Sequence, residues 1–193
     1  MRYTRFSLNG KINNSEKQII NSQRKLFQIT GKKNSKIRIV AAFIFAAAIV
    51  FQIAFIISNS LKNSENSDEQ SGYYVKIVVE KIMHLDYDLQ SESFLGQINH
   101  VIRKAAHFSE YALLSVFVFM LFYIVYFEKK FCFFASSGTA FVVGCIDEFV
   151  QLFSPGRACR FTDVLIDTAG GIFAGAALIV IIKIMFKIKR QYS

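Results

Sequence analysis

Four apolar stretches divide the chain. They cover residues 39–57, 111–127, 131–146 and 164–182, and Asp167 is the only acidic residue within them. A helix needs roughly 20 residues to cross about 30 Å of hydrocarbon at 1.5 Å per residue. The second and third stretches reach that length only if they extend through polar residues. The pattern therefore predicts four transmembrane helices, three of which carry ionisable side chains into the membrane.

This pattern predicts an all-α integral membrane protein built as a four-transmembrane-helix bundle. The expected spans are residues 37–57, 105–127, 131–153 and 163–183. They lie in a membrane domain of residues 37–185, which is preceded by a basic arm (1–36) and followed by a basic tail (186–193). The arm is polar, and we expect it to be mobile or weakly helical. A hydrophobic content of 53%, with 21 Phe and a single Pro, agrees with a chain that folds in lipid.

The distribution of Lys and Arg predicts the orientation of the spans. Residues 1–38 carry ten basic residues against one acid, whereas residues 58–104 carry five against seven acids. Short basic segments stay on the cytoplasmic side. Both termini are therefore predicted to be cytoplasmic, with residues 58–104 as the first extracytoplasmic loop. The net charge of +9 is explained by anchoring to anionic lipids, so the lipid bilayer is the expected partner and nucleic acid is not.

Two amphipathic helices are predicted in the first extracytoplasmic loop. In the first, Val75, Val79 and Ile82 recur at helical spacing, and the second runs from Phe94 to Ala105 without a helix breaker before the second span. Both have the character of helices that lie in the outer membrane interface.

Polar residues gather at the predicted outer ends of three spans. His107 and Tyr111 share one face of the second span, with Arg103 one turn further out. Ionisable groups inside a membrane are costly unless they are paired or hydrated, and they mark functional sites. We therefore predict one outward-facing polar pocket. Its candidate ligand-binding residues are Arg103, His107, Tyr111, Asp147, Glu148, Gln151, Arg157, Asp163 and Asp167.

Structural roles are the alternative for part of this set. The charged residues that surround the start of the fourth span could form a salt-bridge network that only fixes helix ends; these are Arg157, Arg160, Asp163 and Asp167. Gly171 and Gly175 are interpreted as small residues that let helices approach closely.

A metal site is a weaker interpretation of the same residues. His107 and Glu110 form a His-x-x-Glu pair that, with another carboxylate, could bind a divalent ion. Two ligands on one helical turn without a second nearby His are a weak signal, so neither a metal nor another cofactor is predicted. A neutral His107 hydrogen-bonded to Glu110 or Glu148 is the simpler interpretation.

The order and spacing of the polar residues resemble the VanZ-like membrane protein family over about residues 39–183. The matching positions are Arg103-Lys104-x-x-His107-x-x-x-Tyr111, Asp147-Glu148-x-x-Gln151, Arg157, Asp163, Asp167 and Gly170. Val150 stands where many members carry His, and the basic arm is outside the family pattern. The resemblance implies a multi-pass protein of the bacterial plasma membrane that is linked to teicoplanin-type glycopeptide resistance, without an agreed reaction.

Two functions of different class fit these residues. In the first, Arg103, Arg157 and Arg160 bind the phosphate or carboxylate of an envelope amphiphile, such as a lipid-linked wall precursor or the lipoglycopeptide itself. In the second, an enzyme modifies an envelope lipid or wall precursor with Glu148 or His107 as general base. The binder is preferred, because no Gly-x-Ser-x-Gly, P-loop or His-Glu-x-x-His motif is present. A packing subunit of an envelope complex is a third possibility.

Overall fold

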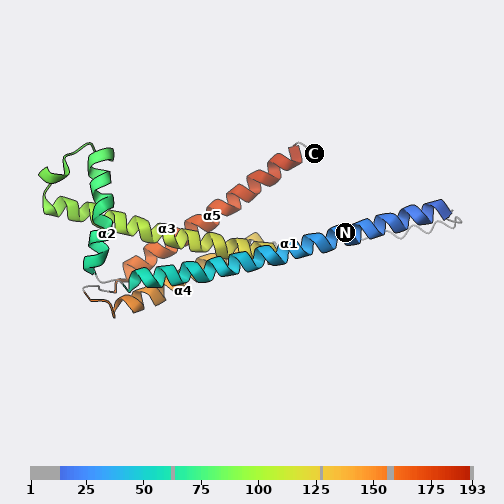
Figure 1. Ribbon diagram of the computed structural model, residues 1–193, viewed down its shortest axis with the longest axis horizontal. Coiled ribbons are helices and arrows are strands. Elements are labelled where there is room, and N and C mark those ends of the chain that lie inside the picture. The colour runs from blue at the N-terminus through green and yellow to red at the C-terminus, as the bar shows by residue number, and fades with distance from the viewer. Residues whose placement is uncertain (1–13, 62–63, 127, 156–158, 192–193) are drawn as a thin grey trace. The chain divides into compact units, whose positions relative to one another are not determined.

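The computed structural model describes residues 14–61, 64–126, 128–155 and 159–191. Helices account for nearly all of these residues, and no strand occurs among them. The main helices, seen in Figure 1, are α1 (Asn14–Ser60), α2 (Ser64–Ile77), α3 (Glu92–Tyr126), α4 (Lys129–Gln151) and α5 (Phe161–Gln191). The chain divides into two units, Met1–Val40 and Ala41–Ser193. In the first unit the described backbone is helical from Asn14, and the second unit contains the helix bundle.

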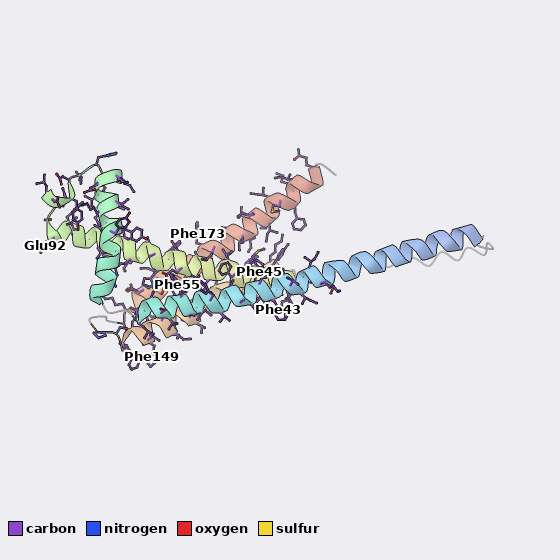
Figure 2. The ribbon with its side chains drawn as sticks, viewed as in Figure 1. Phe43, Phe45, Phe55, Glu92, Phe149 and Phe173 are labelled. Atoms are coloured by element: carbon purple, nitrogen blue, oxygen red, sulfur yellow. The ribbon has the colours of Figure 1, made fainter. Side chains whose placement is uncertain are left out.

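Four of the helices contain segments long and apolar enough to cross a membrane. These segments are Ser35–Ser60, Glu92–Tyr126, Lys129–Gln151 and Phe161–Ile188. Large apolar side chains cover the outside of the bundle, as the exposed fractions of Phe43 (73%), Phe149 (60%) and Phe173 (64%) illustrate (Figure 2). Such a surface is stable against hydrocarbon and not against water. The predicted four-helix, all-α membrane architecture is confirmed.

The third span ends slightly earlier than predicted. The sequence pattern placed its end at Phe153, but α4 ends at Gln151. The amides of Leu152 and Phe153 bond to carbonyls three residues back, which tightens the chain into a turn. Pro155 follows at once, and a proline cannot continue a helix. The polar residues that precede Pro155 are thereby held on the last turn of α4.

The two predicted amphipathic segments are helical. The first is α2, which continues into a wider π-helical turn, Val78–Ile82. Val75 and Val79 are buried where this segment packs against α3. The second forms the first turns of α3, which runs from Glu92 through the second span without interruption, as the missing helix breaker predicted.

Small residues bring α5 close to its neighbours. A methyl group added at Gly170 would lie 2.3 Å from the carbonyl oxygen of Phe108 on α3. One added at Gly171 would lie 2.6 Å from the Ala140 side chain on α4 and 2.7 Å from the Ser115 hydroxyl on α3. Close backbone approach of this kind is how helices pack in membranes. The interpretation of the α5 glycines as packing residues is confirmed for Gly171.

Candidate functional site

Three ionisable side chains from three helices converge at one end of the bundle. This polar end is the end at which α1 and α4 finish and α5 begins. His107 from α3, Asp147 from α4 and Asp167 from α5 each offer one ligand atom within 4.8 Å of the other two. Both aspartates are almost completely buried, and His107 is half-buried. We call these three residues the His–Asp–Asp cluster.

The backbone brings the cluster together for simple reasons. The chain turns between α4 and α5, so Asp147 near the end of one helix lies beside Asp167 in the second turn of the next. Asp167 packs against α4 at Gly144, where a methyl group would be in ordinary van der Waals contact with its carboxylate, at 3.5 Å. The close approach of α5 to α3 at Gly170 brings in His107 from the third side.

The two aspartates have different surroundings. Asp147 accepts a hydrogen bond on each oxygen, one from the Ser60 hydroxyl and one from the Gln151 amide at 3.0 Å. Within the described part of the chain, neither oxygen of Asp167 has a hydrogen-bond partner. The nearest His107 nitrogen lies 3.9 Å from it. Two ionised carboxylates this close repel by roughly 3–4 kcal/mol at an effective dielectric constant of ~20, so the arrangement requires either a shared proton or a positive charge.

Tyr111 and Glu148 flank the cluster. The Tyr111 ring is fully buried beside both aspartates. Glu148 is also buried, and its carboxylate accepts a hydrogen bond from the backbone N–H of Arg160 at 2.6 Å. Glu148 therefore fixes the turn that leads into α5.

Asp163 lies at the edge of the polar end and belongs to a different environment. Its carboxylate pairs with Lys104 at 3.2 Å, and both side chains are about one third exposed. This pair is a salt bridge at a helix end, which is the structural role that the sequence analysis gives as the alternative to ligand binding. Asp167, by contrast, is buried one turn further along α5. Arg103 is half-buried on α3 and Arg160 is exposed. Arg157 lies outside the described residues.

The first helix supplies polar contacts that the sequence analysis missed. Gln52 donates to the backbone carbonyl of Glu110 at 3.1 Å, and Asn59 donates to the Glu110 carboxylate at 3.2 Å. Ser60 is buried and bonds to Asp147, while its own carbonyl accepts from Ser154 at 2.8 Å. Glu110 therefore contacts α1 and does not belong to the His–Asp–Asp cluster. The available signal was Gln52, the only polar residue between positions 39 and 57.

Comparison with known proteins places this architecture in a family. The VanZ/LLP1 family model matches residues 39–184, which include the four spans, the His–Asp–Asp cluster and its surroundings. The chain belongs to the VanZ/LLP1 family. The family match and the four apolar helices together identify a multi-pass bacterial membrane protein, which agrees with the predicted localisation. Neither the curated proteins nor the solved structures give a match.

The orientation of this VanZ/LLP1 protein can be tested at a native residue. Cys159 is exposed and follows α4, on the side predicted to be extracytoplasmic. Partial desolvation and the neighbouring Glu148 carboxylate raise the pKa of its thiol. Since only the thiolate reacts, we expect an impermeant maleimide to label Cys159 in intact cells, slowly at neutral pH and faster as pH rises. Glu148→Gln lowers the thiol pKa and should speed labelling at fixed pH.

The labelling is measured with Cys132 and Cys145 replaced by Ser, so that Cys159 is the single thiol. Labelling that requires permeabilised cells at every pH would reverse the predicted orientation.

Proposed function

We propose that this VanZ/LLP1 protein binds an anionic envelope amphiphile at an outward-facing polar end of its bundle. Through that binding it contributes to resistance against teicoplanin-type glycopeptides. The ligand is a lipid-linked wall precursor or the lipoglycopeptide itself, each of which joins an anionic group to a lipid tail. The supporting observation is a basic rim of Lys104 and Arg160 next to the buried acids: Lys104 pairs with Asp163, and the backbone N–H of Arg160 bonds to Glu148.

Glu148 and Asp163 hold the basic rim in place, and the Arg160 side chain remains exposed. Glu148 binds the backbone of Arg160 and not its guanidinium, and the amide of Asp163 bonds to the carbonyl of Arg160 at 2.9 Å. Lys104 contacts the start of α5, because it forms an ion pair with Asp163. A guanidinium is a planar fork that makes paired hydrogen bonds to phosphate or carboxylate. Arg160 is therefore the residue proposed to make the main contact.

Apolar residues beside the basic rim suit the tail of the ligand. Phe153 and Phe161 flank the turn that carries Arg160, and they are 72% and 66% exposed. Leu152 is 56% exposed on the same turn. Side chains of this kind at a membrane surface lie against acyl chains. An amphiphile is thereby favoured over a small soluble anion.

Arg160→Ala is expected to abolish most of the teicoplanin protection in a strain that lacks the native protein. The reason is the loss of the paired hydrogen bonds to the ligand anion. Lys183→Ala, which removes an exposed cation towards the other end of α5, is the matched control and should protect like the wild type. Susceptibility is measured at equal membrane levels of each variant. Equal protection by Arg160→Ala and the wild type would contradict the proposed binding role.

An enzyme is the second candidate, and the proximity of His107 to Asp167 favours it. An imidazole beside a carboxylate is a common arrangement for a general base. Purified protein incubated with extracted envelope lipids would then change the mass of one lipid, and His107→Gln would prevent the change. If no lipid changes in mass when a series of metal ions is added, the enzyme hypothesis is rejected and the binding role is retained.

A further inference from the structure

We infer that His107, Asp147 and Asp167 form a binding site for one divalent transition-metal ion such as Zn²⁺ or Mn²⁺. The His-x-x-Glu pair that the sequence suggested is not the one that converges; the carboxylates instead come from α4 and α5. The inference concerns the buried cluster itself and does not depend on the anionic ligand proposed above.

The spacing of the cluster suits a bound ion. Zinc binds nitrogen and oxygen ligands at about 2.0–2.2 Å in tetrahedral geometry, so two ligands on one ion lie roughly 3.3–3.6 Å apart. His107 Nδ1 and Asp167 Oδ1 are 3.9 Å apart, which is beyond hydrogen-bond distance and slightly longer than the separation in a closed site. Asp147 completes the set, with its ligand atom no more than 4.8 Å from the other two. Small side-chain rotations therefore suffice to close the three ligands around one ion.

Asp167 gives an independent indication of a ligand. The side chain is 1% exposed, and among the described residues nothing donates a hydrogen bond to either oxygen. Buried carboxylates are expensive unless they are hydrogen-bonded, paired with a charge or bound to a metal. An ion between Asp147 and Asp167 supplies the missing partner for Asp167 and removes the repulsion between the two carboxylates.

Charge and ligand type identify the class of ion. Two carboxylates balance the charge of a divalent ion, and a neutral imidazole adds a nitrogen ligand without changing that balance. Mg²⁺ and Ca²⁺ prefer oxygen ligands, whereas imidazole suits transition metals. Three protein ligands leave coordination positions open. The His107 side chain is 28% exposed, so the ion can enter from its side of the cluster.

The surroundings of Asp147 are those of a supported metal ligand. Ser60 donates a hydrogen bond to one of its oxygens, and Gln151 donates one to the other. Bonds of this kind orient ligands and raise metal affinity in known sites. Gln151 lies one turn after Asp147 on α4, and Ser60 reaches it from the end of α1. The site thus draws on four helices.

Metal content tests the inference directly. The full-length protein, freed of any histidine tag because such tags bind the same ions, is equilibrated with Zn²⁺ or Mn²⁺ in detergent, separated from unbound ion and analysed by mass spectrometry. We expect the wild type to retain about one ion per chain, and Asp167→Asn to bind at least about tenfold more weakly. Asp163→Asn is the matched control. It removes a carboxylate four residues earlier on the same helix, and it should bind like the wild type.

A second variant guards against misfolding of Asp167→Asn. His107 is half-buried, so His107→Gln should fold, and the visible absorption of bound Co²⁺ should change because the nitrogen ligand is lost. Added Zn²⁺ should raise the melting temperature of the wild type and not that of either ligand variant. Wild-type protein that retains no ion and gains no thermal stability would overturn the inference, and a proton would then separate the two carboxylates. Wild-type affinity in both ligand variants would overturn it equally.

Discussion

Gly170→Ala is expected to lower the free energy of unfolding by about 3 kcal/mol or more, because a methyl group has no space at this position. The added carbon would lie 2.3 Å from the backbone carbonyl oxygen of Phe108. A flexible side chain could move aside, but a carbonyl in the middle of a helix can move only if α3 and α5 separate. Separation would also withdraw His107 from Asp167. The stability is measured by SDS titration in mixed micelles, together with the metal content.

Gly138→Ala is the control for Gly170→Ala. Gly138 also lies inside a transmembrane helix, but within the described part of the chain no atom outside the neighbouring backbone of α4 lies within 4 Å of the position its methyl group would take. Alanine is the better helix former by about 1 kcal/mol, so this variant should be neutral or slightly more stable. A loss at Gly138 equal to that at Gly170 would show that the effect comes from the interaction with lipid and not from the contact between α3 and α5.

The helices of this protein could be predicted because their signal is local. The apolar stretches are as long as a bilayer is thick, and the breaker after α4 is a single proline, Pro155. The polar end could also be anticipated, since His107, Asp147 and Asp167 occur at similar depths in spans that are otherwise apolar. The structure brings these three residues together.

The partners within the polar end could not be predicted because they depend on how the helices rotate about their axes. His107 and Glu110 are three residues apart on α3, and spacing alone assigns them to one face. In the bundle, Glu110 bonds to Gln52 and Asn59 of α1, whereas His107 lies beside Asp167. These partners depend on the rotation of α3 about its own axis, which the spacing of residues along one helix does not determine. The three residues of the proposed metal site come from three helices, so spacing along one helix could not indicate them.

The attachment of α1 to the rest of the bundle also depends on contacts between distant residues. α1 has one fully buried apolar side chain near its end, Ile56, and several hydrogen bonds to α3 and α4. The sequence pattern predicts that Ser60 lies at the start of the first extracytoplasmic loop. Its carbonyl instead accepts from Ser154 and its hydroxyl donates to Asp147. Hydrogen bonds between transmembrane helices contribute about 0.6 kcal/mol on average. Asp147 accepts one such bond, from Ser60 of α1, and a second bond from Gln151 within α4.

Asp147→Ala is therefore expected to reduce the free energy of unfolding by about 2–4 kcal/mol. The substitution removes the acceptor from two buried donors, the Ser60 hydroxyl and the Gln151 amide, and a buried donor without a partner costs about 1–3 kcal/mol. Relief of the repulsion between Asp147 and Asp167 acts in the opposite direction. That relief is available only to the metal-free protein, because a bound divalent ion already neutralises both carboxylates. The loss should consequently be larger when wild type and variant are compared in Zn²⁺ than when both are compared in a chelator.

Asp163→Ala separates this effect from the general loss of an acid at the polar end. Its carboxylate is about one third exposed and pairs with Lys104, and an ion pair in such a position contributes only about 0–1 kcal/mol. We expect a change within about 1 kcal/mol that is the same in Zn²⁺ and in chelator, measured by the same SDS titration. If Asp147→Ala were equally mild under both conditions, the Ser60 and Gln151 bonds would not stabilise the bundle. If Asp147→Ala were severe but independent of Zn²⁺, those bonds would stabilise the bundle without an ion, and Asp147 would be a structural acceptor that does not bind metal.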